Sequence, residues 1–224
     1  MQKVLKFGIV LFSFIFTHNL YAQIDSDVYQ WKLKKEGKGV KVFTSKVSGS
    51  KYLAVSAVMT IDAKVDSITS MIMDLENCKR WAPQCAKAYI HESVSKTQNY
   101  VYSLNNIPFP GRNRDAVSYV VWSKDPTTGV VSMISDAVSG KVPKVKGVIR
   151  IEKATAKWRF TPLENGQTLV ESFAHVDPAS DMPKWLLNSL LVGSPYKTMK
   201  RIRKRLKEGP VSYTHLTLPT TPYV

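Results

Sequence analysis

The chain has 224 residues, of which 44% are hydrophobic, so it can bury one sizeable core but is too short for two comfortable domains. Its formal net charge of +15 favours anionic partners, which means nucleic acid or the head groups of a membrane. The chain carries no aromatic-basic motif of the kind found in RNA-recognition modules, so we expect no nucleic-acid partner.

The first 22 residues have the composition of a secretory signal peptide. Lys3 and Lys6 form a basic start, and the apolar run 7–16 is too short to span a bilayer as a mature helix. We expect cleavage after Ala22 and a mature protein that is periplasmic or secreted. An uncleaved membrane anchor is the alternative.

The two cysteines, Cys78 and Cys85, flank Trp81 and Pro83 in one predicted loop. In an oxidising compartment this spacing favours a short-loop disulfide, and two buried free thiols are the alternative. No histidine stands at ligand spacing from either cysteine, so zinc is poorly supported. We expect no metal and no cofactor.

The segment 208–224 differs in character from the sequence before it. Residues 211–224 carry no charge and no helical period, and they follow Gly209-Pro210. They resemble translated sequencing-adapter read-through at the end of an open reading frame. We therefore interpret 208–224 as a non-native tail and 23–207 as one domain.

Most of the domain is predicted to be strand. Residues 31–38 are basic and predict a brief helix, whereas 40–44 and 52–61 alternate like the strands of a hairpin. Asp62 is expected to cap an amphipathic helix over 64–75. The strands predicted after this helix are 86–94, 99–104, 116–122, 130–135, 146–151, 156–161 and 168–176.

The segment 107–115 is predicted to be a turn, because it contains two prolines and a glycine between alternating runs. Gly111 allows a positive φ there, which also favours a turn. Arg114 and Asp115 follow directly, and we interpret them as an ion pair that holds this corner in shape.

A long final helix ends the domain. Asp177-Pro178 ends the last strand, Ser180 or Asp181 is the expected cap, and Pro183 falls in the first helical turn. The order of the elements predicts an α+β fold, in which a curved antiparallel sheet wraps around the C-terminal helix. Such a sheet tends to leave space for a ligand between itself and the helix.

Four segments, in order, resemble the START (StAR-related lipid transfer) domain family over about 31–206. They are Trp31 with 39–43, the segment from Asp74 to Trp81, the Pro-rich turn 108–115, and the stretch from Asp177-Pro178 to Asn188. The resemblance implies a helix-grip fold (START/Bet v 1-like) with a hydrophobic tunnel for one lipid-like molecule, under a lid formed by the last helix. It implies no catalytic machinery.

The sequence departs from the family at two places. Ser180 stands where the family often has glycine. Some sterol-carrying members hold a buried acid and a buried arginine inside the tunnel, and the matching positions here are Val101 and Val120. The resemblance therefore implies an uncharged wall at these two positions.

Alternation along the strands predicts which residues face the tunnel. With Val120 inward, Tyr100, Tyr102 and Tyr119 point away. The predicted lining from the strands is Val101, Ser103, Ala116, Ser118, Val120 and Trp122, and from the last helix it is Trp185, Leu186, Ser189 and Leu190. Arg150 and His175 are candidates for contact with a ligand head group. Ordinary core packing, a solvated Arg150 and a satisfied His175 are the alternatives.

Two further expectations concern surfaces and function. Arg114 and Asp115 are expected at the tunnel mouth, and Lys197, Lys200, Arg201 and Lys204 on the last helix are candidates for docking to an anionic membrane, with a solvated face as the alternative. We expect a monomeric lipid-binding or lipid-transfer protein. The alternative is an enzyme of the cyclase or hydrolase type. Its candidate catalytic residues are limited to His175 and Asp177, because no Gly-x-Ser-x-Gly elbow is present.

Overall fold

The computed structural model describes residues 24, 28–179 and 182–208. The predicted signal peptide, most of the proposed tail, and the proposed helix caps Ser180 and Asp181 lie outside them. The helical elements are α1 (Val65–Met73), the 3-10 turn η1 (Cys78–Arg80) and α2 (Lys184–Lys207). The strands are β1 (Lys32–Gly37), β2 (Val40–Ser45), β3 (Ala54–Ile61), β4 (Cys85–Ser93), β5 (Gln98–Asn105), β6 (Arg114–Lys124), β7 (Val131–Ala137), β8 (Ile149–Ile151), β9 (Ala154–Pro162) and β10 (Thr168–Val176).

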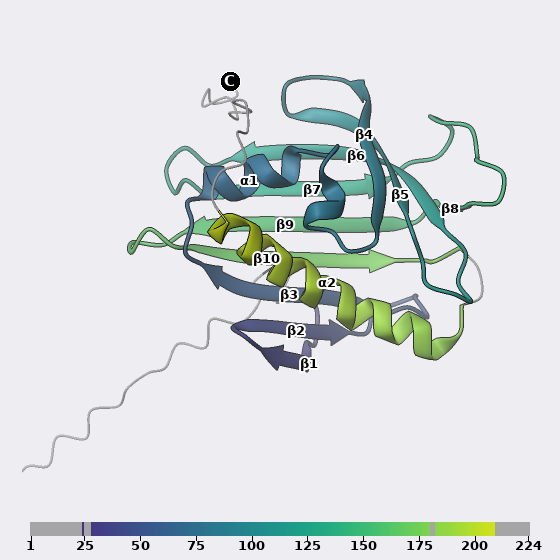
Figure 1. Cartoon of the computed structure of the whole chain (residues 1–224), viewed down its shortest axis with the longest axis horizontal. Coiled ribbons are helices and arrows are strands. Elements are labelled where there is room, and N and C mark those ends of the chain that lie inside the picture. Colours follow the sequence, from purple (N-terminus) through teal and green to yellow (C-terminus); the bar gives the residue numbers. More distant parts are fainter. Residues whose placement is uncertain (1–23, 25–27, 180–181, 209–224) are drawn as a thin grey trace, which may run out of the picture.

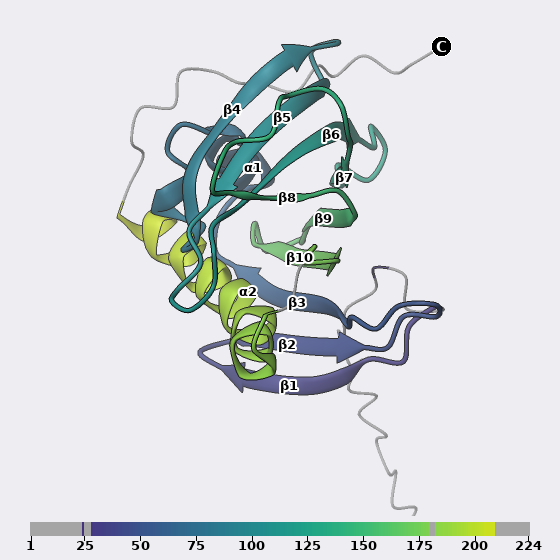
Figure 2. The ribbon, with the colours of Figure 1, turned by 90° about the vertical axis from the view of Figure 1, so that its right-hand side faces the viewer.

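These strands form one sheet in the order β1-β2-β3-β10-β9-β7-β6-β5-β4, and β8 adds a short parallel pairing to β6. The sheet curves strongly, and both helices lie on the same face of it (Figures 1 and 2). Helix α2 packs against β2 and β3, whereas α1 and the loop after it lie over the half of the sheet that contains β6, β7 and β9. The predicted α+β, helix-grip fold is confirmed.

The predicted helix at 31–38 is wrong, because β1 pairs antiparallel with β2 along this segment. Lys38 and Gly39 at the turn have positive φ values of 50° and 68°, which is the geometry of a tight hairpin. The lysines of β1 are exposed, as is usual for an edge strand that must not pair with another chain. The Gly37-Lys38-Gly39 sequence was the available signal for a hairpin.

Helix α1 forms as the helical spacing predicts, but its start differs. Val65, Ile68 and Ile72 are buried in the main core, and the N-cap residue is Lys64, which makes no side-chain capping hydrogen bond. The predicted cap at Asp62 is therefore wrong by two positions. The predicted strand 146–151 is also shorter than expected, since Gly147 has a φ of 85° and pairing starts only at Ile149.

Helix α2 closes the core over the N-terminal strands. Met199 and Ile202 are fully buried and pack with Val40 and Val42 of β2. The helix starts two or three residues later than the predicted caps imply, because Pro183 is its N-cap residue rather than part of its first turn.

The turn between β5 and β6 packs tightly on the start of α2. The amide of Gly111 donates to the carbonyl oxygen of Pro108 at 2.8 Å. A Cβ at Gly111 would clash with Cγ2 of Ile107 and would lie 3.1 Å from Cδ2 of Leu186. The predicted turn is present, but Gly111 is not among the glycines with positive φ, so the turn does not use the conformational freedom that glycine allows. Close approach of the backbone to Leu186 is what glycine permits here.

Candidate functional site

A cavity of about 630 Å³ lies between the curved sheet and the segment that follows α1. One wall consists of residues from β4, β5, β6, β7 and β9. The opposite wall consists of the end of α1 and a loop that includes η1, from which Leu75, Trp81 and Ala82 contribute. This volume is within the range of about 300–1,000 Å³ that is typical of ligand pockets.

The residues predicted on β5 and β6 line this cavity. Val101 and Ser103 come from β5, and Ser118, Val120 and Trp122 come from β6. Successive residues of a strand point to opposite faces, which places Tyr102 and Tyr119 on the other face, as predicted. Ala116, also predicted to face inward, is not part of the lining.

The sequence analysis missed a larger part of the wall. Met133 and Ser135 of β7 and Trp158 of β9 line the cavity, as do polar residues at both ends of β5 and residues of α1, β4 and the hairpin after β4. The missed residues are Ile72, Met73, Leu75, Cys78, Trp81, Ala82, Cys85, Ala88, Ile90, Ser93, Ser95, Lys96, Asn99, Asn105, Met133, Ser135 and Trp158. The same alternation that identified β6 could have identified β7 and β9.

Three aromatic rings give the cavity a rigid apolar end. Phe160 stacks between two cavity residues, with its ring centroid 6.3 Å from Trp122 and 5.8 Å from Trp158. Phe160 itself is fully buried. Offset stacking of this kind adds to the stability gained from burying the rings, and it helps to hold Trp122 and Trp158 in place.

Helix α2 does not line the cavity, which corrects four predicted positions. Trp185 is 63% exposed, Ser189 is exposed and Leu190 is half-buried. Leu186 is buried, but it packs on the turn at Gly111. The reason is that α2 covers β2 and β3, while the loop after α1 covers the cavity.

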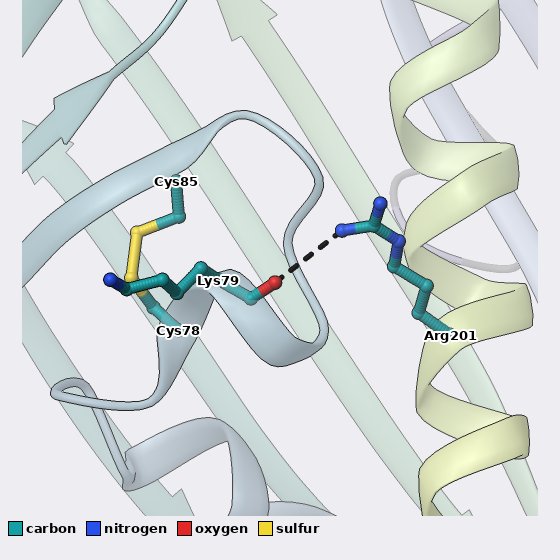
Figure 3. The surroundings of a disulfide bond; sticks show 4 residues. All are labelled: Cys78, Lys79, Cys85 and Arg201. Atoms are coloured by element: carbon teal, nitrogen blue, oxygen red, sulfur yellow. Dashed lines mark hydrogen bonds between the residues drawn. A yellow bond between two sulfur atoms is a disulfide. The ribbon is translucent and has the colours of Figure 1, made fainter.

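A disulfide joins Cys78 and Cys85, with 5.9 Å between their Cα atoms, and both residues line the cavity. The bond therefore closes the loop that forms the cavity's second wall. Arg201 of α2 points at this loop, and its Nη1 donates to the carbonyl oxygen of Lys79 at 3.4 Å (Figure 3). The loop is thus fixed at its base by the disulfide and contacted from α2.

Arg150 pairs with Asp115 instead of reaching into the cavity. Its Nε and Nη2 donate to the two oxygens of Asp115 at 2.8 and 3.0 Å, and Tyr102 Oη donates to Asp115 at 3.2 Å. All three side chains are buried. They lie on the face of β5 and β6 opposite the cavity, so the predicted head-group contact is wrong. We call Tyr102, Asp115 and Arg150 the outer cluster.

The outer cluster also fixes the loop before β8. Arg150 Nη1 and Nη2 donate to the carbonyl oxygens of Val142 and Pro143 at 2.9 and 3.1 Å. Hydrogen bonds to Asp115 raise the pKa of the Arg150 guanidinium, and burial, followed by the Asp115 charge, raises the pKa of Tyr102. Within the cluster, Arg150 therefore keeps its charge and Tyr102 its phenol proton more firmly than the free side chains do.

The predicted pair of Arg114 with Asp115 is also wrong, because adjacent residues of a strand point to opposite faces. Arg114 is buried and donates from Nε to the carbonyl oxygen of Pro178 at 3.1 Å, which links β6 to the segment before α2. Burial, with a smaller effect of Arg112, lowers the pKa of Arg114.

His175 does not line the cavity either. Its Nε2 lies 3.0 Å from Oγ of Ser50, and by alternation it shares its face of β10 with Phe173, which packs in a small cluster separate from the main core. Oδ1 of Asp177 accepts from the amide of Ala179 at 2.9 Å. The candidate catalytic pair is therefore not directed at the cavity.

The proposed docking lysines and arginine lie along α2, and three of the four have interactions. Lys200 lies 5.6 Å from the ring of Tyr196, Lys204 pairs with Glu208 at 3.5 Å, and Arg201 contacts the loop after α1. Lys197 is exposed.

In the described part of the chain, no group of three or more His, Cys, Asp or Glu side chains could hold a metal ion. No described helix is long and apolar enough to cross a membrane.

A curved antiparallel sheet with a long C-terminal helix and an internal cavity defines a class of ligand-binding folds. The START domain family model matches residues 16–210 of this chain. The chain therefore belongs to the START domain family.

Similar proteins occur in bacteria and in animals. An uncharacterized protein of Pseudomonas aeruginosa is 34% identical over 77% of this chain and 85% of its own. A crystal structure of a STAR-related lipid transfer protein from Xanthomonas axonopodis is 28% identical, covers 79% of this chain and 98% of its own, and superposes with a TM-score of 0.72. Human START domain-containing protein 10 is 20% identical over 80% of this chain, which spans 62% of that protein.

Proposed function

We propose that this protein binds one lipid-like molecule in its cavity and carries or stores it in the periplasm without changing it chemically. The observation that carries the proposal is the cavity itself. It is large enough for one ligand, its wall includes three tryptophans and several aliphatic side chains, and it occupies a START domain. The likeness to the Xanthomonas lipid transfer protein supports lipid as the class of ligand.

Two features support export of the protein. The first 22 residues have the composition of a signal peptide. The disulfide between Cys78 and Cys85 would persist in the oxidising periplasm and would be reduced in most cytosols. Cell fractionation, with thiol labelling before and after reduction, tests this part of the proposal. Recovery of the uncleaved chain with free thiols in the cytosol would contradict it.

The basic face of α2 supports contact with an anionic membrane. Lys197, Lys200, Arg201 and Lys204 lie along it, and Lys35 of β1 lies 4.4 Å from the ring of Tyr196 on the same helix. Each such residue near an anionic surface contributes roughly 1 kcal/mol of attraction. Sedimentation with vesicles that contain or lack anionic lipid tests this surface, with Lys197→Gln/Lys204→Gln as the weakened variant.

The decisive experiment extracts the purified protein gently and identifies bound molecules by native mass spectrometry. We expect a co-purifying lipid-like molecule in one copy. Val120→Trp should displace it, because the larger ring fills the cavity. Ile134→Trp is the matched control, since Ile134 lies on the opposite face of β7 and is exposed. An empty protein that also takes up no labelled lipid would contradict the proposal.

A catalytic role makes a different prediction for the same samples. An enzyme would release an altered molecule during incubation, and His175→Ala would stop the alteration without preventing binding. We expect the added lipid to be recovered unchanged from both proteins.

A further inference from the structure

The cavity wall on the sheet has two chemically different ends, and the strand registers define their positions. Trp122 is opposite Met133, which is opposite Trp158, so one row across β6, β7 and β9 is apolar. Two residues along β6, Val120 is opposite both Asn99 and Ser135. From there to the Pro-rich turn, the rows contain polar side chains.

Three serines form a diagonal across the polar rows. Ser135 is opposite Val120, Ser118 is opposite Val101, and Ser103 is opposite Ala116, so each serine is displaced by two residues from the next. Diagonal neighbours of this kind lie roughly 7–8 Å apart and can contact one small polar group between them. We call Ser103, Ser118 and Ser135 the serine row.

The hydroxyl groups of the serine row are available to a ligand. All three residues line the cavity and are only half-buried. Within the described part of the chain, none of the three hydroxyls forms a hydrogen bond with another protein group. A hydroxyl can both donate and accept, so the row can bind an alcohol, an ester or an amide.

The same wall offers no partner for a buried charge. Among the described residues that line the cavity, Lys96 is the one ionisable side chain. It is exposed on the hairpin between β4 and β5, beyond the Trp122 row and at the far end from Ser103. The charges of Asp115 and Arg150 are paired on the opposite face of the sheet. An ionised carboxylate or ammonium placed at the serine row would therefore lose its hydration without a counter-charge.

We propose that the cavity selects a lipid whose buried head is uncharged and hydrogen-bonding, and that the serine row recognises this head. The apolar tail then lies toward Trp122 and Trp158. This inference rests on the proposed lipid-binding function and specifies the chemistry of its ligand.

The test compares four ligands that share one hydrocarbon chain: oleyl alcohol, oleamide, oleate and oleylamine. Binding is measured at pH 8, below the concentrations at which the ligands form micelles, by the fluorescence of the cavity tryptophans Trp81, Trp122 and Trp158. We expect the alcohol and the amide to bind at least about tenfold more tightly than the two charged ligands. Lowering the pH to 5 should bring oleate closer to the alcohol, since burial favours its protonated form.

The variant Ser103→Ala/Ser118→Ala/Ser135→Ala should weaken binding of the alcohol by roughly 5- to 25-fold and leave oleate unchanged, because the bound hydroxyl loses one or two hydrogen bonds and each accounts for about fivefold. Ser123→Ala/Ser132→Ala is the matched control, since these residues pair with each other on the opposite face. It should bind all four ligands as the unmodified protein does.

Three outcomes would overturn the inference. Oleate that binds as tightly as the alcohol at pH 8, and that is lost in Lys96→Gln, would place a charged head at the hairpin instead. A serine variant that keeps the preference for the alcohol would remove the role of the row. Failure of all four ligands to bind would contradict the proposed function itself, and it is distinguishable because the first two outcomes require binding.

Discussion

The polar side chains on the two faces of strands β5 and β6 differ in whether they are hydrogen-bonded within the protein. On the outer face, Asp115 accepts hydrogen bonds from Arg150 and Tyr102, and Arg150 also donates to two backbone carbonyls. On the cavity face, the hydroxyl groups of Ser103 and Ser118 form no hydrogen bond with described protein groups. The outer face therefore contributes to the stability of the sheet, whereas the inner face keeps its hydrogen-bonding capacity for a ligand.

This difference indicates how the fold keeps its strands in place around an internal cavity. A cavity removes packing contacts, and residues around it must be positioned by something else. Here the strands that line the cavity are fixed from behind by the outer cluster, which also anchors the loop before β8. The second wall is fixed by the disulfide and by the contact of Arg201 with Lys79.

The largest effect is expected from breaking the outer cluster. Asp115→Ala leaves the Arg150 charge buried without its partner, which should lower the free energy of unfolding by about 3–5 kcal/mol. Urea unfolding measures the change. Asp136→Ala is the control, because Asp136 is exposed and bonds to Thr155 at the surface, and it should cost less than about 1 kcal/mol. Equal losses in the two variants would contradict a stabilising role that is specific to the cluster.

If Asp115→Ala does not fold, the free energy of unfolding is measured in urea on the double variant Asp115→Leu/Arg150→Met. Replacement of a buried ion pair by apolar residues is often tolerated, so this variant should recover much of the stability. A double variant less stable than Asp115→Ala would show that the carbonyl contacts to Val142 and Pro143, rather than the ion pair, dominate.

The next effect concerns the second wall of the cavity. Cys78→Ala/Cys85→Ala should lower the free energy of unfolding by about 2–3 kcal/mol, as expected from closing a short loop. Unfolding in urea with and without a reductant measures the same quantity in the unmodified protein. Arg201→Gln should have a smaller effect, because it removes one long and exposed hydrogen bond. No change on reduction would mean that the loop is held by packing alone.

The sequence was sufficient to predict the cavity residues on β5 and β6 because alternation is a local property. Once Val120 was placed inward, Ser118 and Trp122 followed. The same rule would have placed Arg150 and His175 outward had the register of β8 and β10 been known. Instead, the polar character of these residues suggested contact with a ligand, and their partners Asp115 and Ser50 are 35 and 125 residues distant in the chain.

The position of α2 could not be predicted from its own sequence. Trp185, Ser189 and Leu190 were predicted to face the tunnel, but the side of a helix that meets a cavity depends on where the cavity lies. Here the cavity lies under the loop after α1, and Met199 and Ile202 fix α2 over β2 and β3. Only the tertiary arrangement determines that outcome.

Tyr102→Phe is expected to have a moderate effect on stability. The variant loses one hydrogen bond to Asp115, which should cost about 1 kcal/mol at pH 7. The pH dependence is more specific. Burial raises the pKa of Tyr102 above its usual value of 10.0, so the folded state holds this proton more tightly than the unfolded state does.

The sign of this pH dependence follows by linkage. The contribution of protonated Tyr102 to the free energy of unfolding is fully present below pH 10.0, the ordinary pKa of the group. It is lost as the pH rises from there through the raised pKa of Tyr102 in the folded state. Urea unfolding at pH 8 and at pH 11 should therefore show a smaller alkaline loss in Tyr102→Phe than in the unmodified protein. An identical loss in both would assign the alkaline sensitivity to other groups.

The smallest effect on stability is expected on the cavity face. Ser118→Ala removes a hydroxyl that forms no hydrogen bond with described protein groups, and alanine fits the strand at that position. The free energy of unfolding of the empty protein should change by less than about 0.5 kcal/mol in urea. A loss as large as that of Tyr102→Phe would mean that Ser118 stabilises the sheet, and the contrast between the two faces would then disappear. Unchanged stability combined with weaker binding of oleyl alcohol would separate the residue's contribution to recognition from any contribution to folding.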